Sequence, residues 1–512
     1  MGEKGSYAGH NKDNVPTEKL KKNKFVYGCV VLASMTSILL GYDIGVMSGA
    51  AMYIQTDLKI SDLQLEILIG ILNLYSLIGS GLAGKTSDMI GRRYTIVFAA
   101  VIFFVGALLM GFATNYAFLM VGRFVAGIGV GYGMMIAPVY TTEVAPASAR
   151  GFLTSLPEVF INIGILLGYV SNLAFSHLND NINWRLMLGI GAVPSVFLGI
   201  GVLAMPESPR WLMMQGRLGD ARKVLLQTSD SKEDAEFRLD DIKAACGISH
   251  HDNSDIVQVP KQSHGQGVWR ELILVPTPAI RRVVIAAVGI HFFQQASGID
   301  AVVLYSPRIF KKAGITKKSR LLAATVAVGF VKTVFILVAT FLVDRLGRRP
   351  LLLSSVGGMI VSLAGLATGL TVVEVNDDKK IMWAIVLCCL MILTFVAFFS
   401  IGIGPVTWVY SAEVFPLRLR AQGCSMGVGV NRVMSGVISM TFLSLTKAIT
   451  IGGAFFLFTG FAIIAWLFIY FFLPETQGKN LEDIGELFGV ETKKYDSGSG
   501  SSKGKKVQLA ER

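Results

Sequence analysis

Charged residues are scarce in this sequence. Asp, Glu, Lys and Arg supply only 16% of the 512 residues, whereas 52% of the residues are hydrophobic. Soluble domains carry about 25% charged residues, so this composition excludes an ordinary soluble domain and indicates lipid as the solvent. The abundance of Gly (55) and Phe (31) is typical of helices that pack closely inside a bilayer.

Cysteine is sparse as well, and N-glycosylation sequons and a cleavable signal are absent. The cysteines lack the spacing of metal ligands, and all but one lie in apolar runs: Cys29, Cys246, Cys388, Cys389 and Cys424. We therefore expect no metal site. The first 24 residues are polar and basic and lack an apolar core, which predicts a cytoplasmic N-terminal tail.

Residue groups typical of enzymes are also missing. The sequence has no His/Cys cluster, no nucleophile elbow and no carboxylate pair suited to glycoside cleavage in its polar parts. The glycine run Gly127, Gly129, Gly131 and Gly133 follows no strand, so it predicts close helix packing rather than a dinucleotide loop. We expect neither an enzyme nor a cofactor. The net charge of +12 does not indicate a nucleic-acid partner, because excess Lys and Arg in a membrane protein marks its cytoplasmic face.

The apolar residues form runs near the length of about 20 residues that a helix needs to cross a bilayer. These runs fall into two groups of six, near 25–48, 63–83, 95–113, 117–140, 152–175 and 186–205, and near 283–305, 321–343, 351–373, 381–410, 422–445 and 452–473. The predicted organisation is a cytoplasmic tail (1–24), a six-helix bundle (25–205), a cytoplasmic linker with short helices (206–280), a second six-helix bundle (281–473) and a cytoplasmic C-terminal segment (474–512), disordered at its end.

The distribution of Lys and Arg predicts the orientation of the spans. In the first half, Lys85, Arg92, Arg93 and the basic residues of the tail lie on one side, and only Lys59 lies clearly on the other. Both termini and the linker are therefore predicted to be cytoplasmic. The basic loop at 308–318 argues against this orientation, and we let the first half decide.

The two halves repeat one another. The motif GRR at 91–93 recurs at 347–349, YTTEVAPASARG recurs as YSAEVFPLRLRAQG, and PES at 206–208 recurs as PET at 474–476. The motifs keep the same order, with an even number of spans between matching copies. This arrangement predicts parallel repeats, as in carriers built from two halves.

Several motifs resemble those of the sugar porter branch of the major facilitator superfamily. They are GKTSDMIGRR (84–93), PESPRWL (206–212), QQASGID (294–300), DRLGRR (344–349) and PETQGKNLEDI (474–484). Within that branch, GYDIGVMSGA, LPEVFINIG and QQASGIDAVVLYSP are most similar to plant polyol/monosaccharide proton symporters. The resemblance implies an all-α membrane protein with twelve transmembrane helices, in two six-helix bundles that rock about a central site.

Ionisable residues inside the predicted spans cost roughly 2.5–3.5 kcal/mol each on insertion scales. Three acids and three bases lie there: Asp43, Glu158, Asp300, Arg123, Lys332 and Arg432. This balance predicts mutual neutralisation in a common central cavity rather than six separate defects.

Asp43 and Arg123 are the predicted proton-coupling pair. A guanidinium favours the charged carboxylate and burial favours the neutral acid, so a site that alternates between wet and dry can bind and release a proton. The resemblance implies this role for the matching Asp and Arg, and facilitative glucose carriers have Asn in place of Asp43. The alternative is a permanent ion pair that only locks two helices together.

A polyhydroxy solute needs neutral donors and acceptors together with an aromatic face. The resemblance implies that Gln294 and Gln295 bind hydroxyl groups, that Trp408 supplies the apolar floor and that Asn431 adds a polar contact. Gly298 permits a local break that would let both glutamines line the cavity. Tyr305 is a predicted extracellular gate.

Three positions depart from the pattern of the relatives. Glu158 stands where sugar porters usually have Gln, Asp300 where many have Asn, and Lys332 where glucose carriers have Asn. Either the site is tuned to linear polyols, because charged acceptors bind hydroxyls more strongly than amides do, or Asp300 and Lys332 pair with each other.

The repeated charged motifs predict a salt-bridge network between the bundles at the cytoplasmic face. Its predicted members are Asp88, Arg92, Arg93, Glu143, Arg150, Asp344, Arg348, Arg349, Glu413 and Arg420. Such a network would hold the outward-open state and break during rocking.

The predicted function is a proton-coupled symporter of the plasma membrane that imports linear polyols, monosaccharides or both by alternating access. Its predicted partners are the solute, the proton and the lipid bilayer. An uncoupled facilitative sugar carrier and a non-transporting sugar sensor are the alternatives. A sensor would normally show a long cytoplasmic tail, and the tail after Pro474 is short.

Overall fold

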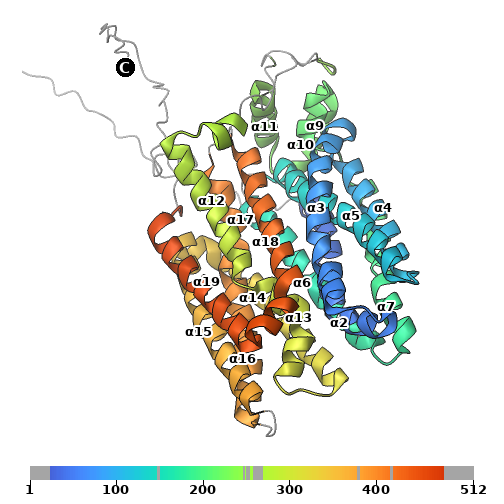
Figure 1. Ribbon diagram of the computed structural model, residues 1–512. Coiled ribbons are helices and arrows are strands. Elements are labelled where there is room, and N and C mark those ends of the chain that lie inside the picture. Colours follow the sequence, from blue (N-terminus) through green and yellow to red (C-terminus); the bar gives the residue numbers. More distant parts are fainter. Residues whose placement is uncertain are drawn as a thin grey trace, which may run out of the picture.

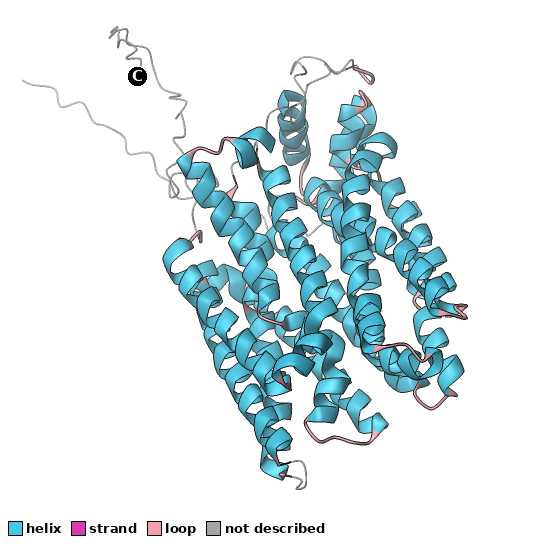
Figure 2. Ribbon diagram, viewed as in Figure 1, coloured by secondary structure: helices cyan, strands magenta, loops and turns pink. Residues whose placement is uncertain are grey.

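The computed structural model describes residues 24–146, 150–245, 248, 254–257, 269–376, 381–415 and 419–477. Within these ranges the elements are helical, and no strand occurs (Figure 1, Figure 2). Twelve helical stretches of this part of the chain are long and apolar enough to cross a membrane. The prediction of an all-α protein with twelve spans is confirmed.

The first and sixth spans are each divided into two helices. The first half comprises α1 (Lys24–Ser34), α2 (Thr36–Leu58), α3 (Asp62–Ile90), α4 (Arg92–Gly111), α5 (Tyr116–Val144), α6 (Arg150–Phe175), α7 (Asp180–Gly189) and α8 (Ala192–Leu203). Ser61 begins α3 with a capping box, in which its hydroxyl accepts the Gln64 N–H while the Gln64 side chain accepts the Ser61 N–H.

The second half also contains two divided spans. It comprises α12 (Pro278–Ala296), α13 (Ile299–Lys312), α14 (Lys318–Leu346), α15 (Arg348–Val375), α16 (Met382–Ile401), α17 (Ile403–Val414), α18 (Arg420–Ile449) and α19 (Ile451–Phe472). Gly298 separates α12 from α13 with φ +83°, a left-handed conformation that favours glycine. A Cβ at this position would lie 2.6 Å from the Phe458 ring, so both backbone and packing require glycine there.

Short helices of the linker lie together at one end of the molecule (Figure 1). They are α9 (Pro209–Met214), α10 (Leu218–Thr228) and α11 (Lys232–Ala245), and a π-helical turn η1 (Arg270–Leu274) precedes α12. Leu212, Met213, Leu225 and Leu239 form a small apolar core among α9, α10 and α11. We call this end of the molecule the linker end.

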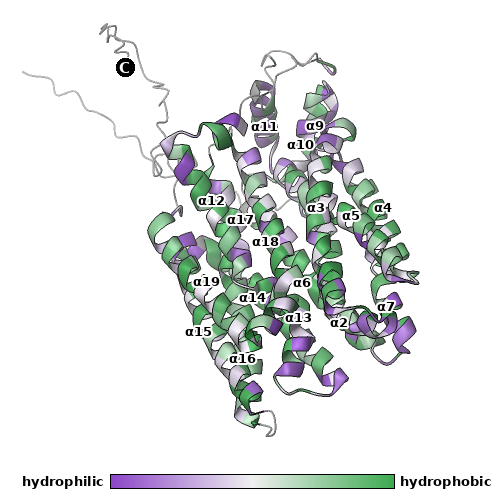
Figure 3. Ribbon diagram, in the orientation of Figure 1, coloured by the Kyte–Doolittle hydropathy of each residue, from purple (hydrophilic) through white to green (hydrophobic). Residues whose placement is uncertain are grey.

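The two halves of the chain lie side by side (Figure 1). Apolar residues cover the lengths of the helices, and polar residues gather toward the ends, as expected for a lipid-embedded body (Figure 3). Between the halves, α3 contacts α18 and α6 contacts α14. The Thr333 hydroxyl of α14 donates to the Asn162 carbonyl of α6 at 3.2 Å, and a Cβ at Gly70 of α3 would lie 2.3 Å from Met440 Cγ of α18.

Candidate functional site

Asp43 of α2 and Arg123 of α5 form a buried ion pair, as predicted. One terminal guanidinium nitrogen, Arg123 Nη1, lies 2.7 and 2.6 Å from the two carboxylate oxygens of Asp43. The remaining N–H groups of Arg123 donate to the Leu68 and Ile69 carbonyls of α3, at 3.0 and 3.1 Å. Asp43 is 2% exposed and Arg123 1% exposed, so the pair is sealed from water in this conformation. The arginine therefore joins three helices of one bundle.

The predicted polar residues of the second half also come together. Gln294 and Gln295 of α12 and Asn431 of α18 are buried. The Asn431 amide donates to Gln294 Oε1 at 2.6 Å, and the Gln295 amide donates to Asn431 Oδ1 at 3.1 Å. Arg432 donates to the same Asn431 oxygen at 2.8 Å.

The two neighbouring glutamines are not equivalent. Gln294 Nε2 donates to the Ile403 and Gly404 carbonyls at the start of α17, at 3.0 and 2.8 Å, so both polar atoms of Gln294 are engaged within the protein. Gln295 Oε1 is buried without a hydrogen-bond partner among the described residues. Both glutamines were predicted to line the cavity, whereas only Gln295 retains an open acceptor in this conformation.

Trp408 of α17 is half-buried and lies beside His291, whose carbonyl accepts the Asn431 amide at 3.5 Å. Its ring contacts His291 of α12 edge-on, with ring centroids 5.0 Å apart. His291 Nε2 lies 3.2 Å from the Ser411 hydroxyl. The tryptophan ring is thus held at the side of the amide cluster, where an apolar solute face would find it.

Four charged residues from four helices form a second group. Lys332 of α14 interacts electrostatically with Glu158 of α6, Asp300 of α13 and Arg432 of α18. Asp300 accepts a hydrogen bond from the Ser435 hydroxyl, and the Lys332 ammonium lies 5.9 Å from the Phe399 ring centroid. Among the side chains that the structure describes, none of these four charges lies within ion-pair distance of another.

The six charges of the predicted spans are therefore divided. Asp43 and Arg123 neutralise each other inside the first bundle, which differs from the single cavity that the sequence analysis expected. The other four charges converge from both halves. Two acids and two bases balance one another as a group, without a direct ion pair among them in the described contacts. The expected alternative of an Asp300–Lys332 ion pair is absent from the described contacts.

Tyr305 of α13 is fully buried rather than at an open surface. Its hydroxyl donates to the Ser439 carbonyl of α18 at 2.6 Å, and its ring packs on Phe442. Beside it, the Tyr169 hydroxyl of α6 donates to the Val303 carbonyl of α13 at 2.7 Å, which joins the two bundles at this level.

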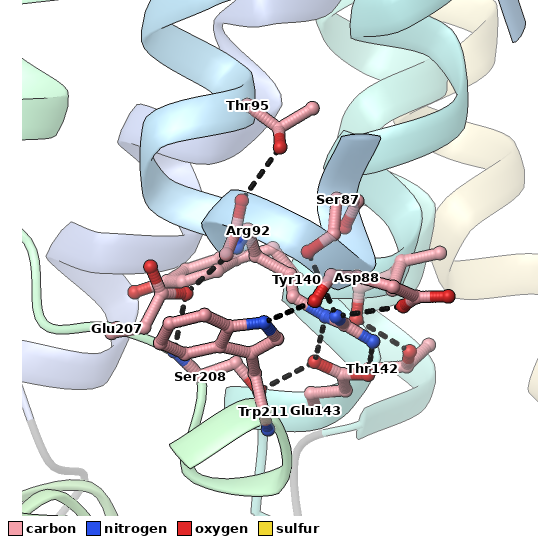
Figure 4. A network of polar contacts seen from close by, with 12 residues as sticks. Ser87, Asp88, Arg92, Thr95, Tyr140, Thr142, Glu143, Glu207, Ser208 and Trp211 are labelled. Atoms are coloured by element: carbon pink, nitrogen blue, oxygen red, sulfur yellow. Dashed lines mark hydrogen bonds and ion pairs between the residues drawn. The ribbon is translucent and has the colours of Figure 1, made fainter. Parts of the chain in front are cut away.

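Arg92 organises a polar network at the linker end (Figure 4). Its guanidinium donates to Glu143 of α5 at 3.0 and 3.2 Å and to Asp88 of α3 at 3.1 Å. Glu207, from the segment before α9, accepts the backbone N–H of Arg92 at 2.8 Å and that of Arg93 at 3.2 Å. Burial raises the pKa of Glu207, although the backbone N–H groups that it accepts oppose this shift.

The second half repeats this network. Arg348 donates to Glu413 at 2.8 Å, and Glu475 accepts the backbone N–H groups of Arg348 and Arg349 at 3.0 and 2.9 Å. Burial also raises the pKa of Glu475, but the backbone N–H groups of four residues outweigh it and hold the pKa below its usual value. The Thr476 hydroxyl donates to Glu413 at 2.7 Å, as Ser208 does to Glu143 in the first half.

The predicted salt bridges between the bundles stay a prediction, because the described members pair within their own half and the side chains of three members are not described. The ion pairs of Arg92 with Asp88 and Glu143 lie within the first half, and that of Arg348 with Glu413 lies within the second. The side chains of Arg150, Asp344 and Arg420 lie outside the described residues. The repeated PES and PET motifs predicted no role for Glu207 or Glu475, whose contacts with the backbone of the arginines appear only in the fold.

A further acid, Glu66 of α3, was also missed. It lies inside the predicted span 63–83 and is 0% exposed. The charge itself was the available signal, because an ionisable residue at membrane depth is a functional candidate by default.

Comparisons with known proteins are consistent with this geometry. The family model "Sugar (and other) transporter" matches residues 29–488. Polyol transporter 5 of Arabidopsis thaliana is 68% identical over 475 residues, which cover 93% of this chain and 88% of the relative. Glucose transporter GlcP of Staphylococcus epidermidis is 34% identical over 465 residues, which cover 91% of this chain and 97% of the relative.

Solved structures have the same fold. The proton:xylose symporter XylE bound to 6-bromo-6-deoxy-D-glucose superposes with a TM-score of 0.73 at 26% identity, covering 91% of this chain and 99% of that chain. An inward-open structure of XylE from E. coli gives a TM-score of 0.73 at 25% identity, covering 90% of this chain and 100% of that chain.

Proposed function

This chain belongs to the sugar transporter family and is a multi-pass membrane transporter rather than an enzyme, and from that premise we propose that it is a proton-coupled symporter for linear polyols or monosaccharides. The relative with 68% identity is named a polyol transporter, and the solved structure at 26% identity is that of a proton:xylose symporter. Both names support the proposal.

The proton site proposed here is the Asp43–Arg123 pair. In the sealed conformation, the guanidinium binds the carboxyl group of Asp43 and is itself anchored by the Leu68 and Ile69 carbonyls. When the vestibule opens, water can solvate the guanidinium and release the carboxyl to take up a proton. This buried pair, with the arginine anchored and the aspartate held by a single partner, is the observation that carries the coupling.

The proposed solute site lies where the two halves meet. Gln295 supplies a buried acceptor without a partner, Asn431 orients it, and Trp408 supplies an apolar face. Glu158 and Lys332 add a charged acceptor and a charged donor with no described ion-pair partner, and both can bind hydroxyl groups. A flexible linear polyol loses more conformational entropy on binding than a ring, so stronger hydrogen bonds favour this solute class. Gln294, Asp300 and Tyr305 then shape the site through their internal bonds.

The proposed movement is alternating access. The bundles formed by residues 25–205 and 281–473 rock about the central site, and the segment 206–280 lies on the cytoplasmic side. Lys and Arg at the linker end support a cytoplasmic placement of both termini, and the membrane of this proposal is the plasma membrane. In this conformation the described polar contacts between the bundles lie in the middle and at the end opposite α9–α11.

One experiment tests the function directly. The chain is expressed in a cell that lacks solute uptake, and solute-induced currents are recorded against external pH for sorbitol, xylitol and glucose. Inward currents that grow with external acidity and follow the polyols support the proposal. Uptake without current would favour an uncoupled carrier, and a strict preference for glucose would overturn the polyol assignment.

A further inference from the structure

Glu66 makes a polar contact between the bundles that neither charge pairing nor the repeated motifs explain. Its carboxylate oxygens accept the backbone N–H of Ser444 at 2.7 Å and the Ser444 hydroxyl at 2.5 Å. Glu66 lies on α3 and Ser444 on α18, so these bonds join the first half to the second. No cation lies within ion-pair distance of Glu66 among the described residues, although its side chain is fully buried.

Around Glu66, the charged groups of α3 face groups of opposite charge on α13 and α18. We call this contact between the two halves the seam. One helical turn before it on α3, Asp62 binds Lys447 of α18 at 2.5 Å and Arg308 of α13 at 3.7 Å. Tyr305 of α13 also lies close enough to Glu66 for the two to interact electrostatically. The first half thus brings two acids to this seam, and the second half brings two cations and the two donors of Ser444.

The two acids differ in their access to water. The Asp62 side chain is 32% exposed and that of Lys447 is 67% exposed, so their pair is screened and contributes little. Glu66 is 0% exposed, and a buried carboxylate that loses its donors remains uncompensated until water reaches it. Separation of α3 from α18 therefore has to break the bonds to Ser444 and rehydrate Glu66 in one step.

We propose that Glu66 is a positioning residue of the transport cycle, whose carboxylate latches α3 to Ser444 of α18 and stabilises the conformation closed at the end opposite α9–α11. With the proposed orientation, this end is extracellular and the latch favours the inward-facing state. The latch does not depend on the identity of the solute or on proton coupling. It acts on the equilibrium between the two states, since a contact made in only one of them shifts their populations.

The test measures that equilibrium in the purified full-length protein without solute. Spin labels are placed at Leu178→Cys, after α6, and Val375→Cys, at the end of α15, in a variant whose native cysteines are replaced. Both positions are exposed and lie at the end opposite α9–α11, in different halves. Electron–electron distance measurement then resolves a short, closed population and a long, open one.

We expect Glu66→Ala to raise the open-to-closed ratio about tenfold, the effect of losing hydrogen bonds to one charged group. Asp62→Asn is the matched control one turn away, and the ratio should rise less than about threefold because its pairs are exposed. Glu66→Gln and Ser444→Ala are measured beside them, so that the test does not depend on one variant folding. A residue that only supports the fold would lower thermal stability and leave the ratio unchanged.

The proposal is overturned if the folded Glu66 and Ser444 variants keep the distance distribution of the parent. The orientation is checked separately by modifying Val375→Cys with a membrane-impermeant thiol reagent in intact cells. Protection of that cysteine would place this end in the cytoplasm and leave the latch itself intact. Failure of the latch and failure of the proposed orientation are therefore distinguishable.

Discussion

Glu207 and Glu475 hold the same place in the two halves of the chain, because each carboxylate accepts the backbone N–H groups of two adjacent arginines at the start of a helix, α4 for Glu207 and α15 for Glu475. Their environments nevertheless differ. Burial dominates at Glu207 and raises its pKa, whereas at Glu475 the backbone N–H groups outweigh burial and lower its pKa.

This difference predicts opposite responses of stability to acid. The pKa of Glu207 is raised in the folded protein. Glu207 therefore stabilises the fold at pH values below its pKa in the unfolded chain, and this stabilisation is lost as the pH rises through its pKa in the folded protein. The pKa of Glu475 is lowered in the folded protein. Glu475 therefore stabilises the fold at pH values above its pKa in the unfolded chain, and this stabilisation is lost as the pH falls through its pKa in the folded protein. On acidification from about pH 7 to pH 4, we expect the melting temperature of Glu475→Gln to fall less than that of the parent protein. Over the same range, the melting temperature of Glu207→Gln should fall more than that of the parent. Melting curves in detergent check this, and equal slopes for both variants would contradict it.

The Arg92 network predicts unequal stability costs in the two halves. Glu143→Gln leaves Arg92, whose side chain is 8% exposed, without its main acid, and loss of one partner of a buried pair costs about 3–5 kcal/mol. Glu413→Gln should cost less, because Arg348 and Glu413 are 12% and 20% exposed. Thermal unfolding of the two variants under identical conditions measures the difference. A larger loss for Glu413→Gln would show that exposure does not decide it.

Asp43→Asn separates proton coupling from solute movement. The amide keeps one oxygen for Arg123, and the Leu68 and Ile69 carbonyls still hold the guanidinium, so we expect the variant to fold. Accumulation against a gradient should be lost, while exchange of labelled for unlabelled solute persists. Proteoliposomes with and without an imposed pH gradient provide the measurement. Undiminished uphill uptake would refute the assignment.

Substitutions of the two adjacent glutamines should have different effects on solute binding and on protein stability. Gln295 holds the open acceptor, so Gln295→Ala should weaken solute binding about tenfold, the effect of one hydrogen bond of about 1.4 kcal/mol, and should lower the melting temperature less than Gln294→Ala does, because the Gln295 amide makes one internal bond, to Asn431. Gln294 bonds to α17 and to Asn431, so Gln294→Ala should mainly lower the melting temperature. Solute titration and melting curves on the same preparations compare the two. Equal binding losses with unchanged stability would mean that both residues contact the solute.

Much of the architecture was predictable because lipid imposes a strong pattern. Uninterrupted apolar runs and the repeated GRR motif give the twelve spans and their division into halves. The contact between Asp43 and Arg123 was also predictable, because an ionisable side chain at membrane depth usually pairs with one of opposite charge. Sequence repetition cannot say which copy of a motif contacts which, so the pairing of Arg92 and of Arg348 with acids of their own halves could not be predicted.

Other features depend on side-chain direction, which no periodicity supplies. Gln294 and Gln295 have the same chemistry, and only the position of α17 makes one internal and leaves the other open. Glu66 lies near the start of its span, where the sequence pattern predicts that an acid marks the helix end facing water. Only the fold shows its contact with Ser444. The convergence of Glu158, Asp300 and Lys332 was expected, but their separation from Asp43 and Arg123 depends on how distant helices pack.

Gly298 has an electrostatic consequence beyond chain geometry. Because α12 stops and α13 restarts at Ile299, the first peptide N–H groups of a new helix lie partway through the span. Their aligned dipoles are equivalent to roughly half a positive elementary charge, and Asp300 sits in that first turn. The break thus places the negative C-terminal end of α12 beside the positive N-terminal end of α13 inside the carrier. No change in acidity removes these two backbone dipole ends, and they persist when the side chains around them are replaced.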